Sequence, residues 1–209
     1  MGKELELGEF DLDSFLNQEE CAVVETPKEN HLYVIFGIDA SNSMRGYKIG
    51  AVNDVVNNTI SRLKSFDKGA DCSVQIAVVG FSERLFRWTN GFIPATDFKF
   101  SYVEMVDGKT DICGFIDELV RLTQSVNAGN ADHICAILFS DGLPTTDYEQ
   151  SISAWRSCSN YSKVKRIAVS FDDDIEDSQS REMLEAFVDS GIILSIKRQD
   201  DILSEILNS

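Results

Sequence analysis

The strongest constraint on the fold is an alternation of short apolar runs with helical apolar stripes, which begins at His31 and continues to the C-terminus. Two of the apolar runs, Tyr33–Ile38 and Ile134–Phe139, end abruptly at a polar residue. Uniformly apolar runs of this length are typical of parallel strands buried on both faces, because helices cover both sides of such a sheet. The alternation therefore predicts a doubly wound, mostly parallel α/β domain.

Six strands are expected in the sheet, with helices on both of its faces. The strands are predicted at Tyr33–Ile38, Ser73–Phe81, Arg84–Trp88, His133–Phe139, Arg166–Phe171 and Ile192–Ile196. Apolar residues three and four positions apart predict helices around residues 49–66, 112–122, 152–158 and 183–188, and a short terminal helix from Asp201. Arg84–Trp88 follows the preceding strand so closely that a hairpin, and therefore one antiparallel edge strand, is favoured. Residues 89–109 are expected to be irregular.

The chain divides into an acidic N-terminal arm, residues 1–30, and one domain, residues 31–209. A length of 209 residues with 43% apolar residues suffices for a single α/β domain with a covered sheet. The arm carries scattered apolar residues, among them Phe10, Phe15 and Leu16. We expect these residues to pack on the edge of the domain, with contact to a partner as the alternative.

The acidity of the chain excludes several classes of partner. It contains 35 Asp and Glu against 19 Lys and Arg, which gives a formal net charge of -16. Such a charge opposes affinity for nucleic-acid phosphates and for anionic lipid. The N-terminal sequence MGKELELGEFDLD has acidic residues where a secretory signal needs basic ones, and no apolar run approaches the ~20 residues of a membrane span. We expect neither a nucleic-acid nor a membrane partner.

Cysteine usage points to a reducing compartment. The five cysteines are odd in number and widely spaced, and no CxxC pair occurs; they are Cys21, Cys72, Cys113, Cys135 and Cys158. This pattern argues against a disulfide framework and against structural zinc, so the thiols are expected to be free and buried or half-buried. A cytoplasmic location is the consistent expectation.

Five oxygen-bearing side chains on three separate segments predict one divalent-metal site. They are Asp39, Ser41 and Ser43 after the first strand, Thr110 before a helix, and Asp141 after the strand His133–Phe139. Open α/β sheets bind ligands at the carboxyl ends of their strands, where these segments lie. Carboxylate, hydroxyl and water oxygens are the ligands of Mg²⁺ and Mn²⁺. We predict Mg²⁺ or Mn²⁺, with Ca²⁺ as an alternative.

From about His31 to the C-terminus, the chain resembles the von Willebrand factor A domain family. The metal-ion-dependent adhesion site of that family combines Asp-x-Ser-x-Ser with a distant Thr and a distant Asp. The resemblance implies a Rossmann-like fold in which the hydroxyls of Ser41, Ser43 and Thr110 ligate the metal. It also implies that Asp39 and Asp141 bind the metal directly or through water.

The same resemblance implies a binding module and not an enzyme. An acidic side chain from a partner protein would complete the coordination shell, because two carboxylates and three neutral hydroxyls leave a free position. The segments IDASNSMRG and SDGLPTTD look closest to the bacterial intracellular branch, which includes proteins encoded near tellurium-resistance genes. That branch implies a stress-response or signalling assembly.

Two residues depart from the pattern of the family. Asn42 stands where Gly is usual, so we expect the loop to use the ease with which Asn adopts left-handed backbone. Lys109 precedes the Thr where the bacterial branch commonly has Gly, which places a positive charge beside the site and favours an acidic partner there.

Two alternatives to metal-dependent binding stay open. The first is a magnesium-dependent phosphohydrolase, although Ser41 stands where the haloacid dehalogenase-like motif has its second Asp. The second is a purely structural module with a degenerate metal site. Nucleotide hydrolysis is disfavoured, because Val103 occupies the position of the first Gly of a phosphate loop ending at Thr110. His31 and His133 lie at strand starts and are expected to be structural.

A cluster of acidic residues follows the strand Arg166–Phe171. It contains Asp172, Asp173, Asp174, Glu176 and Asp177. We expect a solvated loop here, because a run of like charges repels itself and favours water. Its position at a strand end places it on the same rim as Asp39 and Asp141, where we hypothesise that it favours a partner with a basic surface.

Overall fold

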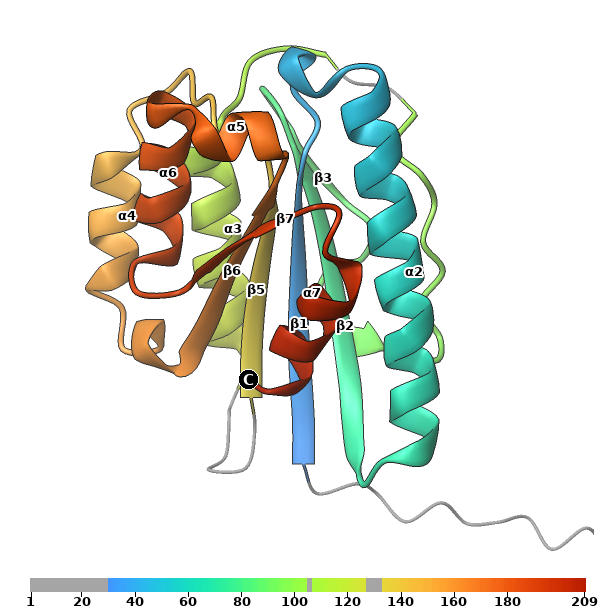
Figure 1. Cartoon of the computed structure of the whole chain (residues 1–209). Coiled ribbons are helices and arrows are strands. Elements are labelled where there is room, and N and C mark those ends of the chain that lie inside the picture. Colours follow the sequence, from blue (N-terminus) through green and yellow to red (C-terminus); the bar gives the residue numbers. More distant parts are fainter. Residues whose placement is uncertain (1–29, 105–106, 127–132) are drawn as a thin grey trace, which may run out of the picture.

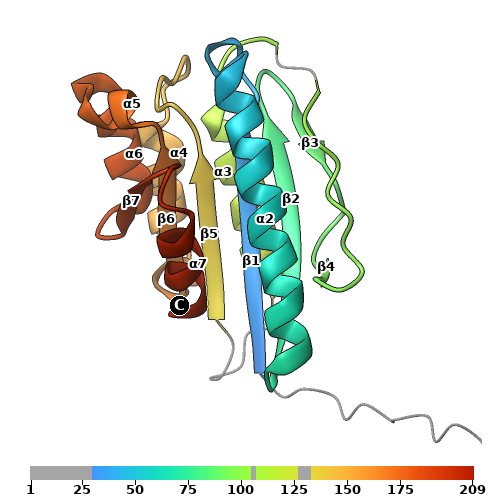
Figure 2. The same cartoon turned by 45° about the vertical axis from the view of Figure 1, so that its right-hand side comes forward.

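The computed structural model describes residues 30–104, 107–126 and 133–209, which form one central sheet with helices on both faces (Figure 1, Figure 2). Apart from Asn30, the expected N-terminal arm lies outside the described residues, as does Cys21. The strands are β1 (Asn30–Asp39), β2 (Cys72–Phe81), β3 (Leu85–Arg87), β4 (Ile93–Pro94), β5 (His133–Phe139), β6 (Val164–Ser170) and β7 (Ile192–Ser195). The helices are α2 (Tyr47–Gly69), α3 (Ile112–Ser125), α4 (Glu149–Arg156), α5 (Asp172–Glu176), α6 (Ser178–Val188) and α7 (Gln199–Leu207), with 3₁₀ turns η1 (Asn42–Met44) and η2 (Tyr161–Lys163).

The sheet has the doubly wound topology that the sequence predicts. Its order is β3-β2-β1-β5-β6-β7, and β4 also pairs with β2. Strands β2, β1, β5, β6 and β7 are parallel, whereas β3 and β4 run antiparallel to β2. The expected antiparallel edge strand is β3. The seventh strand, β4, lies in the stretch expected to be irregular and ends in Pro94, which is tolerated at a sheet edge because it has no N–H to donate.

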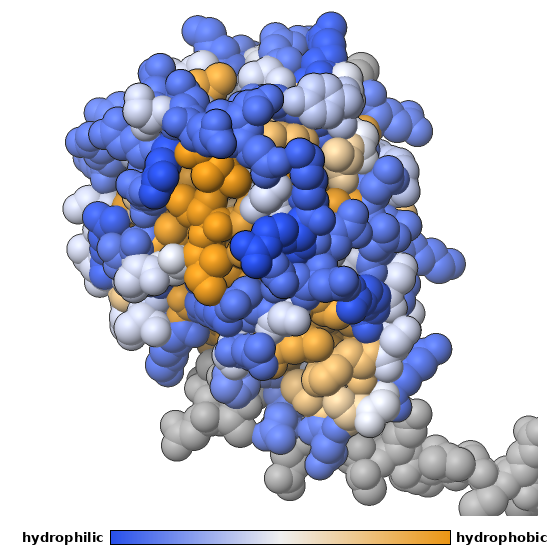
Figure 3. All heavy atoms as spheres, viewed as in Figure 1, coloured by the Kyte–Doolittle hydropathy of each residue, from blue (hydrophilic) through white to orange (hydrophobic). Residues whose placement is uncertain are grey.

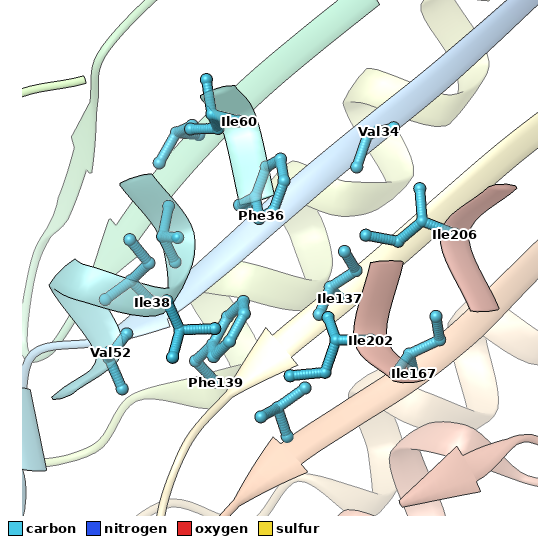
Figure 4. Packing of buried hydrophobic residues seen from close by; sticks show 14 of the residues in the cluster. Val34, Phe36, Ile38, Val52, Ile60, Ile137, Phe139, Ile167, Ile202 and Ile206 are labelled. Atoms are coloured by element: carbon cyan, nitrogen blue, oxygen red, sulfur yellow. The ribbon is translucent and has the colours of Figure 1, made fainter. Parts of the chain in front are cut away.

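Side chains of β1 alternate between two hydrophobic cores. Val34, Phe36 and Ile38 contribute to the core beneath α2 and α7, while Ile35 contributes to the core beneath α3, α4 and α6. Figure 4 shows Phe36 and Ile38 beside Phe139 of β5, with side chains of α2 and α7 closing over them. Burial of each large apolar side chain stabilises the folded state by roughly 1.5–3 kcal/mol. The helices on both faces of the sheet are therefore held by hydrophobic burial.

Gly37 allows α3 to pack closely against β1. A Cβ atom at this position would lie 2.2 Å from Cζ of Phe115. The Phe115 ring also stacks on Phe81 of β2, with 5.0 Å between ring centroids. The glycine therefore makes room for an aromatic ring over the middle of the sheet.

The chain reverses direction across the sheet at β1 and β5. From β1 the chain leaves to α2 on one face, and it enters β5 after α3 on the other face. In the register of these strands Ile38 faces Phe139, so Asp39 and Ser140 leave the sheet side by side. This edge is the switch point, where ligands bind in open α/β sheets. Asn30 and the C-terminus lie toward the opposite end of the molecule (Figure 1).

The acidic segment after β6 is helical, which corrects the expectation of a loop. Asp172–Glu176 forms α5, and its three aspartates occupy the first turn. Acidic side chains are favoured there by the partial positive charge of a helix N-terminus. Asp177 then caps α6 by accepting hydrogen bonds from the N–H groups of Gln179 and Ser180 at 3.0 and 2.9 Å. Local capping therefore outweighs the mutual repulsion of the acids.

The long connection between β4 and α3 is fastened to α2. The Asn53 side chain donates to the Val103 carbonyl at 3.1 Å and accepts from the Val103 N–H at 3.0 Å. Lys64 Nζ donates to the Phe98 carbonyl at 2.5 Å. Since these bonds satisfy backbone groups as a neighbouring strand would, they hold the connection that leads to Thr110.

The surface in the view of Figure 3 is mostly hydrophilic, with a band of hydrophobic residues on the β7 side of the sheet. At that edge Ile192 and Ile193 are half-buried.

Within the described ranges, no helix is both long and apolar enough to cross a membrane. The four cysteines of those ranges are buried or half-buried, as predicted, and Cys113, Cys135 and Cys158 are free thiols. Burial raises the pKa of the Cys135 thiol to about 12, which makes it unreactive at neutral pH.

Candidate metal centre

Asp39 is the last residue of β1, and its carboxylate is fixed from two sides. Oδ1 accepts a hydrogen bond from the Ser41 N–H at 2.9 Å, and Oδ2 accepts one from the Ser140 hydroxyl at 2.7 Å. The side chain is completely buried. Its orientation at the switch point is therefore set by the backbone turn after β1 and by the residue after β5.

The environment of Asp39 disfavours its negative charge. Burial raises the pKa of this carboxyl to about 6, and the nearby charge of Asp141 adds to the shift, while the hydrogen bonds from Ser140 and Ser41 partly offset it. The ionised group thus lacks compensation from the protein. A bound cation would supply that compensation, because an adjacent positive charge stabilises the carboxylate.

Ser41 and Ser43 are brought together by the 3₁₀ turn η1. Their hydroxyl oxygens lie 3.0 Å apart. Met44, at the end of the turn, is completely buried and anchors the loop in the core. The turn therefore holds the two hydroxyls side by side in the loop that directly follows Asp39.

Asn42 does not need the left-handed backbone that we expected of it. In the described ranges, Asp189 is the sole residue other than glycine with positive φ. Asn42 lies instead within the ordinary 3₁₀ turn, and its N–H donates to the Gly108 carbonyl at 3.0 Å. The departure from Gly is accommodated because the exposed side chain points away from the core and accepts a hydrogen bond from Arg45.

Thr110 is buried between the two aspartate loops. Its carbonyl accepts hydrogen bonds from the N–H and the hydroxyl of Thr145, at 3.2 and 3.0 Å, which ties it to the loop after Asp141. The next residue, Asp111, caps α3 by accepting from the Gly114 N–H at 3.4 Å. The hydroxyl of Thr110 is therefore not needed as a helix cap.

Asp141 is completely buried and lies two residues beyond β5. Its Oδ1 accepts from the Leu143 N–H at 3.4 Å, and its Oδ2 accepts from Lys48 Nζ at 3.2 Å. The turn that follows is tight, because Gly142 has φ +79 and a Cβ atom there would lie 2.4 Å from the Ser180 carbonyl oxygen. The glycine thus lets the Asp141 loop pack against α6.

Sequence reasoning missed Lys48. This lysine lies in the first turn of α2 and bridges Asp141 to Asp174 of α5. The two histidines that were expected to be structural are far from the site, since His31 and His133 lie at the starts of β1 and β5.

The residues gathered at the switch point fit a hard divalent cation in chemistry. Across the ranges that the structure describes, no cluster of three or more His, Cys, Asp and Glu side chains could hold a metal, so ligation here would depend on hydroxyl oxygens and water. Two buried carboxylates lie close enough for their charges to interact. The hydroxyl-bearing residues belong to the loop after β1 and to Thr110, which is hydrogen-bonded to the loop after β5. This donor set suits Mg²⁺ or Mn²⁺. The assignment of these five residues as ligands stays a prediction.

A groove of about 1190 Å³ opens beside the site along β3. Asn42, Gly108 and Lys109 line its end next to the candidate ligands, and Phe86 and Trp88 line its length. Lys109 is thus placed on the rim of both features.

The fold is shared with solved structures of low sequence identity. The pilus adhesin SpaC from Lactobacillus rhamnosus GG superposes with a TM-score of 0.64 at 14% identity, over 86% of this chain. A von Willebrand factor type A protein from Catenulispora acidiphila gives 0.58 at 15% identity, again over 86%. The chain has the von Willebrand factor A fold. Proximal thread matrix protein 1 from the mussel byssus, whose metal-ion-dependent adhesion site holds zinc in the solved structure, gives 0.58 at 19% identity over 85%.

The von Willebrand A fold accounts for only part of several of these proteins. The chain spans 29% of the adhesin, 42% of the Catenulispora protein and 45% of the byssus protein. No protein-family model matches the sequence, and no curated protein matches it either. The similarity therefore establishes the fold and leaves the function to be argued from the residues of the site.

Proposed function

We propose that this chain is a protein-binding module that captures its partner through a divalent cation and performs no chemistry itself. The observation that carries the proposal is the buried Asp39 carboxylate, which is held in place by Ser41 and Ser140 while its charge is left uncompensated. The proposed ligands are Asp39, Ser41, Ser43, Thr110 and Asp141. When bound, the cation would accept a carboxylate of the partner in its open coordination position.

Other residues of the chain orient the proposed ligands. The Ser140 hydroxyl and the Ser41 N–H fix the orientation of Asp39, and the Thr145 bonds to Thr110 hold the third segment in place. Lys109 on the exposed rim attracts an acidic side chain toward a protein that otherwise repels acids. The resemblance to the bacterial branch supports a cytoplasmic stress-response or signalling assembly as the setting.

Calorimetry tests metal binding directly. Titration of the metal-free chain with MgCl₂ and MnCl₂ is expected to show one site, lost in Thr110→Val, which keeps the shape of the side chain and removes its hydroxyl. Thr146→Val in the exposed loop after Asp141 is the matched control and is expected to bind as the wild type does. Absence of binding heat in the wild type would leave only the structural module with a degenerate site.

Partner capture tests the function. The full chain, immobilised, is expected to retain a protein from native lysate in Mg²⁺ and to release it when a chelator is added. Retention that is indifferent to chelator and to Thr110→Val contradicts metal-dependent binding. Turnover of an aryl phosphate in Mg²⁺, lost on Asp39→Ala, would instead establish the phosphohydrolase alternative.

A further inference from the structure

Lys48 places an ammonium group inside the candidate site. Its Nζ lies 3.2 Å from Asp141 Oδ2, and 3.1 and 2.9 Å from the two carboxylate oxygens of Asp174. The ring of Phe171 covers it, with 5.3 Å from Nζ to the ring centroid. Only 15% of the lysine side chain is exposed, and Asp141 is not exposed at all. The ammonium is therefore an integral part of the site and not a surface ion pair.

A lysine ammonium is positively charged at neutral pH, and this one is held between two carboxylates, those of Asp141 and Asp174. Buried ion pairs of this kind are sensitive to the loss of one partner, because the remaining charge is left uncompensated. A divalent cation that draws Asp141 into its shell would impose that loss on Lys48.

We infer that Lys48 is a tethered cation that competes with the divalent ion for Asp141 and couples metal binding to the position of α5. The inference rests on the proposed metal site. Two positive charges that share one carboxylate repel each other, so occupancy by metal weakens the Lys48–Asp141 contact. The lysine then depends on Asp174 alone, and α5 responds because Asp174 lies in its first turn.

The competing explanation is that Lys48 positions Asp141 for the metal. In that case removal of the ammonium weakens metal binding, whereas competition predicts that removal strengthens it. The sign of the change separates the two.

The affinity of Lys48→Met for Mn²⁺ shows whether removal of the ammonium strengthens or weakens metal binding. Methionine retains most of the apolar length of the side chain and removes its charge, so the affinity for Mn²⁺ is expected to rise at least about tenfold in calorimetry. Lys48→Arg keeps the charge and is expected to bind Mn²⁺ close to the wild-type level. Lys68→Met, twenty residues along the same helix and therefore about 30 Å away, is the matched control. Lys48→Gln replaces Lys48→Met if the latter fails to fold by circular dichroism.

The outcomes distinguish this inference from the proposed function. Unchanged or weaker Mn²⁺ binding in Lys48→Met, with a clear site in the wild type, overturns competition and leaves the metal site intact. Absence of Mn²⁺ binding in both proteins overturns the metal site itself. Binding that emerges only in Lys48→Met supports competition most strongly.

Amide exchange tests the coupling to α5. The Ile175 N–H donates to the Phe171 carbonyl at 2.9 Å. The exchange rate of this amide proton therefore reports whether the first turn of α5 is formed. Saturating Mn²⁺ is expected to speed this exchange in the wild type. In Lys48→Met the exchange is expected to be fast without Mn²⁺ and to change little when it is added. A wild-type rate indifferent to Mn²⁺ contradicts the coupling.

Discussion

At the scale of single residues, the two aspartates of the site differ in how their charges are balanced. Asp141 has the ammonium of Lys48 beside it, whereas the described residues that hydrogen-bond to Asp39 offer only hydroxyl and amide protons. Asp39 is therefore the carboxylate that most needs an external cation. Its raised pKa makes this difference measurable without any metal.

Asp39→Asn is expected to stabilise the metal-free protein at pH 7.5. Because the folded protein raises the pKa of Asp39 from 3.8 to about 6, it binds this proton more tightly than the unfolded chain does. Stability is consequently lost as the pH rises through that window, and the full cost, up to about 3 kcal/mol, applies above it. The advantage of the variant in the free energy of urea unfolding should therefore shrink toward pH 4.

Asp71→Asn, at an exposed turn before β2, is the control for this comparison and is expected to change stability by less than about 0.5 kcal/mol. A loss of stability in Asp39→Asn at pH 7.5 would mean that the hydrogen bonds to this carboxylate outweigh its burial.

At the scale of helices and strands, close approach between β1 and α3 depends on a single missing Cβ atom. Gly37→Ala is expected to destabilise the protein by about 1–3 kcal/mol, because the new methyl group overlaps the Phe115 ring. Phe115→Leu should recover part of that loss in the double variant, since leucine occupies less of the same space. Urea unfolding of the three variants measures both effects.

Gly50→Ala is expected to change stability in the opposite direction from Gly37→Ala. This glycine lies in α2, and a Cβ atom added there would have no heavy atom within 4 Å, so alanine is expected to stabilise the helix by roughly 0.5–1 kcal/mol. Equal destabilisation by both alanines would contradict the role assigned to Phe115.

The elements that could be predicted are those with long periodic patterns. Strand β5 begins and ends where the apolar run His133–Phe139 predicts, and the α2 stripe of Ile49, Val52 and Val56 is buried as expected. Helix α5 and strand β4 are too short for any period to be read from the sequence. Lys48 was missed because its two partners are 93 and 126 residues away, and such a contact exists only once the fold brings β5 and α5 together.

At the scale of the whole molecule, a net charge of -16 opposes the compact state through self-repulsion. Added salt screens this repulsion, with a Debye length of about 10 Å at 0.1 M. Any cation should therefore stabilise the protein to some extent. A metal site adds a specific contribution on top of the screening, since binding to the folded state alone raises its stability.

The midpoint of thermal unfolding separates these contributions. NaCl is expected to raise the Tm of the metal-free protein gradually, and MgCl₂ at matched ionic strength is expected to raise it further. In Thr110→Val the two salts should give the same Tm. Identical effects of the salts on the wild type would argue that screening accounts for the whole response.

Strand β1 crosses the sheet from end to end, so its first residue lies far from the candidate metal centre at its last residue. The strand runs ten residues from Asn30 to Asp39, which separates its ends by about 30 Å. The C-terminus lies toward the Asn30 end as well (Figure 1). A surface, bead or fused protein joined directly to the C-terminus thus attaches on the far side from the candidate metal centre, and leaves that centre facing outward.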